Sequence, residues 1–340
     1  MKYLITWGCG FIGCNFAIKL AERGDEVTVL DNLCRKWATD NYNYLKANYP
    51  QIKIVCADVR IDNRTLQNLV STVDVVYHLA GQVAVTTSFV DPRGDFEANA
   101  LGTFNILEAI RLSGNKPIMI YASTNKVYGG MEHIRIEEIN NRYMYADLPK
   151  WIKEDTLLDF HSPYGCSKGT ADQYVRDYSR MYDLRTVVMR QSCIYGTRQF
   201  GIEDQGWVAW FTIAAMLDKE ITIFGDGKQV RDVLFIDDLF NAWDQSVKHI
   251  DVCSGQVFNI GGGINFTMSL LELLAYLERF LNKKIKYKFG DRRPGDQPVY
   301  ISDIDKAQDI FWREPKISVE EWVKTLSAWV ANNKDMFHHF

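Results

Sequence analysis

The stretch YLITWGCGFIGCNFAIKLAERGDEVTVLD, residues 3–31, decides the fold. Its first apolar run, residues 3–6, has the length and composition of a buried strand. Residues 12–23 then carry apolar side chains at helical spacing, and residues 26–30 form a second run rich in β-branched residues that ends at Asp31. A strand, a helix and a second strand in this order predict the first right-handed crossover of a parallel sheet.

The same alternation continues through the first half of the chain. Further strands are predicted at residues 52–55, 74–79, 117–121 and 185–190, with helices near residues 103–112 and 167–181. Parallel strands joined by helices require crossovers that cover both faces of the sheet. The fold class is therefore predicted to be α/β, with a doubly wound parallel sheet.

The alternation ends after Gln191. An aromatic-rich stretch, short strands near residues 221–224 and 233–236, and a helix at residues 270–281 follow. We expect a smaller α+β carboxy-terminal domain that is interleaved with the first, without a flexible linker. The nucleotide-binding domain is predicted to comprise residues 1–187 and about 229–262, and the substrate domain residues about 188–228 and 263–340.

The composition describes an ordinary globular protein and excludes several classes of function. The 340 residues are 47% hydrophobic and 24% charged, which rules out disordered and collagen-like chains. A net charge of −4 supplies no basic field, so no nucleic-acid partner is predicted. No run approaches the ~20 apolar residues of a membrane span and no signal-peptide pattern is present, so we expect a cytoplasmic protein without a membrane partner. The seven cysteines form no C-x-x-C pair or metal-like cluster, which predicts reduced thiols and no metal site.

The loop between the first strand and helix is rich in glycine. It reads Thr6-Trp-Gly-Cys-Gly-Phe-Ile-Gly13, and Gly10 and Gly13 stand where a dinucleotide-binding turn needs close backbone approach to a pyrophosphate. The free N–H groups at the start of the following helix suit the same anion. Strand, loop and helix together predict a dinucleotide site.

Asp31 selects between the two nicotinamide cofactors. It follows Gly10 by 21 residues, at the end of the second predicted strand. A carboxylate there accepts hydrogen bonds from ribose hydroxyls and repels a 2′-phosphate, which favours NAD over NADP. Arg35 and Lys36 favour NADP, but more weakly.

A candidate catalytic group consists of Tyr164, Lys168 and Thr124. The segment Tyr164-Gly-Cys-Ser-Lys168 opens a predicted helix and places both side chains on one face. We expect the lysine ammonium to lower the pKa of the phenol, so that Tyr164 can take a proton from a carbinol. Thr124 ends a predicted strand, at the sheet edge where ligands of open α/β folds bind, and can bond the same oxygen. The three residues predict hydride-transfer chemistry at a carbinol.

These features together resemble the extended short-chain dehydrogenases/reductases, in the nucleotide-sugar epimerase/dehydratase family, over nearly the whole chain. The other matching segments are Asp58-Val-Arg60, His78-Leu-Ala-Gly-Gln82, Asn99, Val127-Tyr-Gly129, Gly225-Asp-Gly-Lys-Gln-Val-Arg-Asp232, Phe258-Asn-Ile-Gly-Gly262 and Arg293-Pro-Gly-Asp-Gln297. The resemblance implies a Rossmann-type fold, tightly bound NAD and redox-neutral chemistry. The cofactor-binding residues that it implies are Gly8, Gly10, Phe11, Ile12, Gly13, Asp31, Asn32, Asp58, Val59, Leu79, Ala80, Gln82, Asn99, Tyr164 and Lys168.

Three segments are similar to a narrower group, the CDP-tyvelose 2-epimerases, which invert C2 of CDP-paratose. They are Ser123-Thr-Asn-Lys126, Asp159-Phe-His-Ser-Pro-Tyr-Gly-Cys-Ser-Lys-Gly169 and Asp204-Gln-Gly-Trp207. A 4,6-dehydratase of the family has an Asp-Glu acid/base pair where this chain has Asn125 and Lys126, so dehydration is not expected. The 4-epimerases usually have an Asn where this chain has Ser192 and Cys193, which weakens the alternative of a UDP-hexose or UDP-hexuronate 4-epimerase without excluding it.

The resemblance also implies how the substrate is held. A CDP-sugar is favoured, and Arg231 and Arg293 match the family's diphosphate clamp; the alternative for each is a salt bridge, to Asp232 or Asp296. The substrate-binding residues that we expect are Ser123, Thr124, Asn125, His161, Ser192, Trp207, Arg231 and Arg293. Members of the family commonly pair, so a homo-oligomer, a dimer or a tetramer, is expected.

The chain departs from the family pattern at five positions. Trp7, Trp37 and Trp151 stand where the resemblance predicts Gly, and Cys14 and Cys34 where it predicts Ser. Either these residues are genuine and the cofactor pocket is remodelled, or the recorded sequence is faulty, since Gly and Trp codons, like Ser and Cys codons, can differ by a single base. The intact mass distinguishes the two. Trp7 also keeps open a third reading, a catalytically inactive dinucleotide-fold binding protein, which the intact Thr124, Tyr164 and Lys168 argue against.

Overall fold

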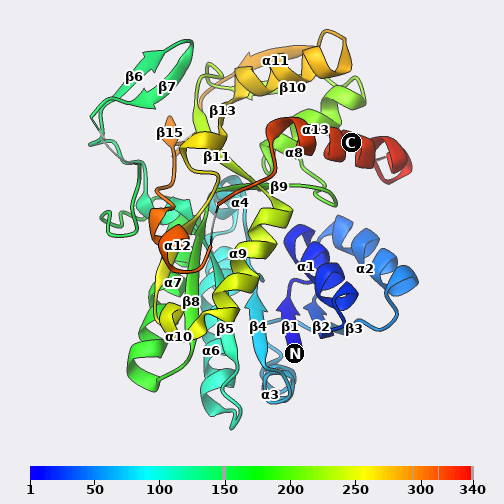
Figure 1. Cartoon of the computed structure of the whole chain (residues 1–340), viewed down its shortest axis with the longest axis vertical. Helices are drawn as coiled ribbons and strands as arrows, with labels where there is room; N and C mark the ends of the chain where they lie inside the picture. The colour runs from blue at the N-terminus through cyan, green and yellow to red at the C-terminus, as the bar shows by residue number, and fades with distance from the viewer. Residues whose placement is uncertain (148–150, 294, 313, 338–340) are drawn as a thin grey trace.

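The structure is a computed structural model that describes residues 1–147, 151–293, 295–312 and 314–337. Its centre is a seven-stranded, all-parallel sheet (Figure 1). In spatial order the strands are β12 (Val257–Ile260), β8 (Thr186–Gln191), β5 (Ile118–Thr124), β4 (Val75–His78), β1 (Lys2–Thr6), β2 (Glu26–Asp31) and β3 (Lys53–Cys56). The predicted Rossmann-type α/β class is therefore confirmed.

Helices cover both faces of this sheet because its strands are apolar on both sides. In β1, Tyr3 and Ile5 point into one core and Leu4 into the other. The first core packs against α1 (Phe11–Glu22), α2 (Lys36–Asn48) and α9 (Ile236–Lys248); the second packs against α3 (Asn63–Val70), α6 (Gly102–Leu112) and α7 (Ser162–Tyr182). Five short helices accompany these long ones: α4 (Val85–Val90), α5 (Pro92–Phe96), the π-helix Glu97–Leu101, α10 (Ile250–Cys253) and α12 (Asp305–Ile310).

A smaller unit lies over the carboxyl ends of the central strands (Figure 1). Its four-stranded sheet is made of β9 (Cys193–Tyr195), β11 (Val230–Phe235), β13 (Thr267–Ser269) and β15 (Val299–Tyr300). Two more pairs, β10 (Ile221–Phe224) with β14 (Tyr287–Gly290) and β6 (Ile136–Ile139) with β7 (Arg142–Tyr145), flank it. The helices are α8 (Trp207–Met216), α11 (Leu270–Leu281) and α13 (Val319–Asn332), with 3-10 turns at Asn125–Tyr128, Ile264–Phe266 and Lys334–Phe337.

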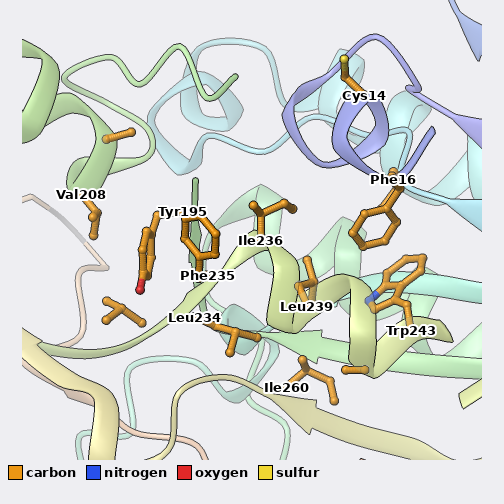
Figure 2. Packing of buried hydrophobic residues seen from close by; sticks show 14 of the residues in the cluster. Cys14, Phe16, Tyr195, Val208, Leu234, Phe235, Ile236, Leu239, Trp243 and Ile260 are labelled. Atoms are coloured by element: carbon orange, nitrogen blue, oxygen red, sulfur yellow. The ribbon is translucent and has the colours of Figure 1, made fainter. Parts of the chain in front are cut away.

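The two units share one hydrophobic core. Figure 2 shows Phe16 of α1 beside Trp243 of α9, with Tyr195 and Val208 of the smaller unit in the same cluster. The rings of Phe16 and Trp243 lie 5.4 Å apart, edge to face. The proposed division at residues 187/188, 228/229 and 262/263 stays a prediction; β8 spans the first of these boundaries, and β11 lies in the smaller sheet.

The strands and helices of the Rossmann half that were predicted from periodicity are present, within a few residues of their expected ends. The hairpin β6–β7 and helix α2 were not anticipated. All seven cysteines are free. Among the residues that the structure describes, we find no helical segment with the length and apolar content needed to cross a bilayer.

Candidate functional site

The glycine-rich loop is packed so tightly that side chains are excluded at two of its positions. A Cβ atom on Gly8 would lie 2.4 Å from Val29, and one on Gly13 would lie 2.4 Å from the carbonyl oxygen of Trp7. Gly10 precedes α1 and has no side chain with which to cap it, so the first N–H groups of the helix face the loop without an internal acceptor. This end of α1 is suited to a pyrophosphate.

Of the five residues that depart from the family pattern, Trp7 has the clearest structural consequence. Its φ is +55°, in the left-handed region that favours glycine. The indole packs over Gly10, where an added Cβ would lie 3.0 Å from the ring. Trp7 is also the only described residue that lines both of two cavities beside the loop.

The first cavity, of about 200 Å³, lies beyond the end of β2. Asp31 is 2% exposed here, and its carboxylate accepts hydrogen bonds from the backbone N–H groups of Cys9, at 2.9 Å, and Leu33, at 2.8 Å. Burial raises the pKa of Asp31, against these two hydrogen bonds. Asp58 accepts a bond of 2.9 Å from Asn32 and pairs with Arg60, which holds the pKa of Asp58 at about 2. We call this the adenosine cavity; the predicted residues that line it are Asp31, Asn32, Asp58, Val59, Ala80 and Gln82.

The second cavity, of about 410 Å³, lies between the central sheet and the smaller unit. We call it the substrate cavity. The predicted residues that line it are Gly10, Phe11, Ile12, Gly13, Leu79, Ser123, Thr124, Asn125, Tyr164, Lys168, Ser192, Trp207, Arg231 and Arg293. Trp37 lies in this lining as well, whereas Trp151 packs in a separate hydrophobic cluster.

Three predicted residues do not line either cavity: Gly8, Asn99 and His161. Asn99 is fully buried, donates to Ser167 at 3.0 Å and faces Gly81 with its amide oxygen. His161 precedes α7 on the exposed side, where its Nε2 lies 3.6 Å from Asp159. Their assigned contacts with cofactor and substrate stay predictions, and the geometry gives them no direct support.

Tyr164 and Lys168 lie one turn apart at the start of α7, and Thr124 ends the neighbouring strand β5. Lys168 is 4% exposed; its ammonium donates to the carbonyl of Ala122 and lies 4.4 Å from the ring centroid of Tyr121. Burial lowers the pKa of Lys168 to about 7, against the opposing effect of nearby carboxylates.

The expected lowering of the Tyr164 pKa is wrong for this structure. Burial raises the pKa of the phenol to about 12, and the hydrogen bond with Thr124 offsets only part of that rise. The physical reason is that the Lys168 ammonium is directed to the Ala122 carbonyl, so it contributes little to the phenolate while both groups lose hydration.

A buried polar network holds the start of α7 against the preceding segment. Asp95, 1% exposed, accepts hydrogen bonds from Ser167 and from Gln82, the latter at 2.7 Å. Asn99 donates to both Asp95 and Ser167. Because Ser167 bonds both Asp95 and Asn99, and Gln82 and Asn99 in turn bond Asp95, the network ties the helix that carries Tyr164 to residues 82–99.

Two hydroxyls that were expected to meet substrate are engaged within the protein. Ser123 donates to Asp172 at 2.7 Å, and Asp172 forms a fully buried pair with Arg190 at 3.0 Å. Ser192 donates to the backbone carbonyl of Asp232 at 2.9 Å. Both serines line the substrate cavity with their hydroxyls already bonded.

The cationic end of the substrate cavity is paired with carboxylates. Arg231 binds Asp296 at 2.6 Å, which is one of the two salt bridges weighed from the sequence. Arg293 instead binds Asp204 at 2.8 Å, and its guanidinium lies 3.8 Å from the ring centroid of Phe224. Pro294, in the same predicted motif, lies outside the described residues.

Sequence reasoning missed two glutamines of this cavity. The amide nitrogen of Gln191 and the amide oxygen of Gln199 are buried and have no partner within the described chain. Gln191 ends strand β8. The signal that identified Thr124, a polar residue at the carboxyl end of a central strand, would have found Gln191 too.

The site fits a dinucleotide. An uncapped helix start, a glycine cradle and a carboxylate at the end of β2 line the two cavities in the order pyrophosphate and ribose require. The described residues include no cluster of three or more His, Cys, Asp or Glu side chains that could hold a metal ion.

Comparison with known proteins finds similarity to nucleotide-sugar epimerases and dehydratases over nearly the whole chain. The family model described as GDP-mannose 4,6 dehydratase matches residues 4–326. CDP-paratose 2-epimerase from Salmonella typhi is 43% identical over 98% of this chain and 100% of its own, and UDP-glucuronate 4-epimerase from Thermodesulfobacterium geofontis is 30% identical over 98% and 97%. The crystal structure of UDP-glucuronic acid 4-epimerase from Bacillus cereus, in complex with UDP-glucuronic acid and NAD, is 26% identical, covers 98% of this chain and 99% of its own, and superposes with a TM-score of 0.83.

Proposed function

Because the chain belongs to the GDP-mannose 4,6-dehydratase family, within the extended short-chain dehydrogenases/reductases, we propose that it inverts C2 of a CDP-hexose, converting CDP-paratose to CDP-tyvelose. It is an NAD-dependent nucleotide-sugar epimerase. The observation that carries the choice of substrate is the 43% identity to CDP-paratose 2-epimerase over 98% of the chain.

The residues of the substrate cavity account for the steps. Bound NAD supplies the acceptor and later the donor of a hydride. Thr124 holds the oxygen of the reacting carbinol, and Tyr164 takes its proton as the C–H bond gives up the hydride and a C=O bond forms. After the keto sugar presents its other face, Tyr164 returns the proton to the oxygen and the hydride returns to carbon, so no net oxidation occurs.

The pKa of Tyr164 must fall before it can act as a base. At about 12 the phenol is protonated, a state suited to the return of the proton. Lys168 lies one helical turn away on the same face and can stabilise the phenolate once its ammonium turns from the Ala122 carbonyl.

Dehydration is not supported by the residues beside Thr124. Asn125 and Lys126 follow it in the cavity lining, and neither supplies the Asp-Glu pair of a 4,6-dehydratase. A second candidate, 4-epimerisation of a UDP-hexose, is favoured by the TM-score of 0.83 to a UDP-glucuronic acid 4-epimerase. Ser192 and Cys193 stand where those enzymes usually have Asn.

The test is incubation of the purified protein with CDP-, UDP- and GDP-hexoses in ordinary and deuterated water, followed by NMR of the sugar. We expect a C2 epimer of CDP-paratose without solvent deuterium, because hydride passes directly between carbon and cofactor. Inversion of C4 of a UDP-sugar alone, or deuterium at carbon, would refute the proposal.

We also propose that the protein pairs through helices α6 and α7. Their outer face exposes apolar side chains, with Phe104 and Tyr174 37% and 45% exposed and their rings 5.8 Å apart. Leu101 and Tyr182 extend this apolar face. Contiguous exposed apolar surface of this kind marks an interface. Light scattering should find a dimer or tetramer that Phe104→Glu dissociates; a monomeric wild type would contradict pairing.

A further inference from the structure

Lys126 connects the catalytic end of the substrate cavity to its cationic end. It lies in the 3-10 turn Asn125–Tyr128, directly after β5. Its backbone N–H lies 3.3 Å from the hydroxyl of Thr124, and a Cβ atom on Gly165 would lie 3.3 Å from its carbonyl oxygen. The backbone of Lys126 is therefore held against both the strand end and the helix start that carry Thr124 and Tyr164.

The side chain of Lys126 extends toward the predicted diphosphate clamp. Its Nζ lies 3.7 Å from Asp296, and the same carboxylate oxygen accepts a bond of 2.6 Å from Arg231. Two cations thus share one carboxylate, and Arg231 makes the closer contact. Burial and the neighbouring Arg231 lower the pKa of Lys126 to about 8, as expected for an ammonium that is incompletely neutralised.

The position of the reacting carbon explains why a cation is useful near Thr124 and Tyr164. C2 of a hexose is bonded to C1, which carries the diphosphate, whereas C4 lies across the ring from C1. Inversion at C2 therefore requires the β-phosphate to lie closer to Thr124 and Tyr164 than inversion at C4 does. A phosphate drawn toward that end of the cavity leaves water and needs a cation beside it.

We propose that Lys126 binds the β-phosphate of the CDP-hexose and thereby directs C2, rather than C4, to Thr124 and Tyr164. Lysine suits this role because its ammonium is a compact point charge with three donors. Asp296 then shares or releases its contact with Lys126. This inference rests on the proposed function, since it assigns the position of inversion to one side chain.

The experiment compares Lys126→Met with Lys126→Arg, using Lys283→Met as a matched control. Lys283 pairs with Asp218 on the surface, away from the cavity. Calorimetry measures the affinities for CDP and CMP, which differ in the β-phosphate. In Lys126→Met the ratio of the two affinities should fall about tenfold, the usual size of a charge-assisted contact to phosphate. In Lys126→Arg the ratio of CDP to CMP affinity should stay close to the wild-type value, and in the control Lys283→Met it should equal that value.

Kinetics with CDP-paratose complete the test. In Lys126→Met we expect KM to rise and the rate of C2 inversion to fall, while NAD affinity is unchanged; a merely structural residue would alter NAD binding or thermal stability as well. An unchanged ratio of CDP to CMP affinity would overturn the proposal. If Lys126→Met does not fold, Lys126→Gln provides the same comparison.

Failure of the proposed function is a separate result. If the wild-type protein does not invert C2 of CDP-paratose, the assigned substrate is wrong. The CDP and CMP affinities of the Lys126 variants still decide whether Lys126 meets the β-phosphate. If the wild type inverts C2 and Lys126→Met does so at the same rate, only the role of Lys126 is overturned.

Discussion

Asp31 in the adenosine cavity and the two arginines of the substrate cavity are held in opposite ways. The carboxylate of Asp31 accepts hydrogen bonds from the backbone N–H groups of Cys9 and Leu33. Arg231 and Arg293 are instead paired with carboxylate side chains. The partners of Asp31 are backbone groups, whereas the partners of the two arginines are side chains, which can change rotamer.

This difference indicates which part of the site is preformed. Backbone donors keep Asp31 oriented whether or not a ribose accompanies it, so the adenosine cavity changes little on binding. In the substrate cavity, Asp296 is bound to the Arg231 guanidinium that a diphosphate would use. Burial acts to raise the pKa of Asp296, but Arg231 and Lys126 hold this pKa below its ordinary value, so the carboxylate stays charged. A diphosphate that enters must compete with this carboxylate.

Tyr164→Phe separates binding from chemistry and should have the largest effect. Loss of the hydroxyl removes the proton acceptor, so the epimerisation rate should fall by about 10²–10⁴-fold. The affinities for NAD and CDP should change little, because neither cavity loses a charged group. NMR turnover assays and calorimetry measure both quantities, and Tyr287→Phe, on the exposed strand β14, is the control. A parallel loss of NAD binding would show that the phenol organises the cofactor cavity instead.

Trp7→Gly removes the side chain that stands between the two cavities. NAD affinity should rise about tenfold, because the indole no longer occupies the loop where the pyrophosphate passes. The free energy of unfolding should change by no more than about 1 kcal/mol, since relief of the left-handed backbone strain offsets the lost packing and the added chain entropy.

Calorimetry with NAD and thermal melting measure these two effects of Trp7→Gly. Trp151→Gly is the matched control, because Trp151 packs away from both cavities and its loss should destabilise the fold without tightening NAD binding. Equal NAD affinity in wild type and Trp7→Gly would mean that the indole already accommodates the cofactor.

Asp204→Asn tests the exchange of partners in the substrate cavity and should have the smallest effect. Without the carboxylate, Arg293 is free for the diphosphate, and CDP affinity should rise about two- to fivefold, the worth of a partly exposed ion pair. The gain should shrink at high salt. Asp218→Asn is the surface control. Weaker CDP binding in Asp204→Asn would show that Asp204 positions Arg293 rather than competes for it.

Much of the Rossmann half could be predicted because its signals are local. The apolar runs of β1 and β2 and the helical period of α1 lie within 31 residues, and the spacing of Tyr164 and Lys168 sets their common face by helix geometry alone. Helix α2 escaped prediction because its buried residues, Ala38, Asn41 and Leu45, form only a narrow stripe that includes a polar side chain.

The sequence by itself therefore determined the fold class and predicted the glycine cradle, Asp31 and the shared helix face of Tyr164 and Lys168, since each of these signals is local. The tertiary structure alone decided the partners: Arg231 meets Asp296 from 65 residues away, and Arg293 meets Asp204 from another distant segment of the chain. It also placed His161 beside Asp159 and outside the lining of both cavities, and it raised the pKa of Tyr164. It placed Lys126 between the end of β5 and the Arg231–Asp296 pair. Such contacts depend on how distant segments pack and on the water that packing removes, and no local pattern encodes either.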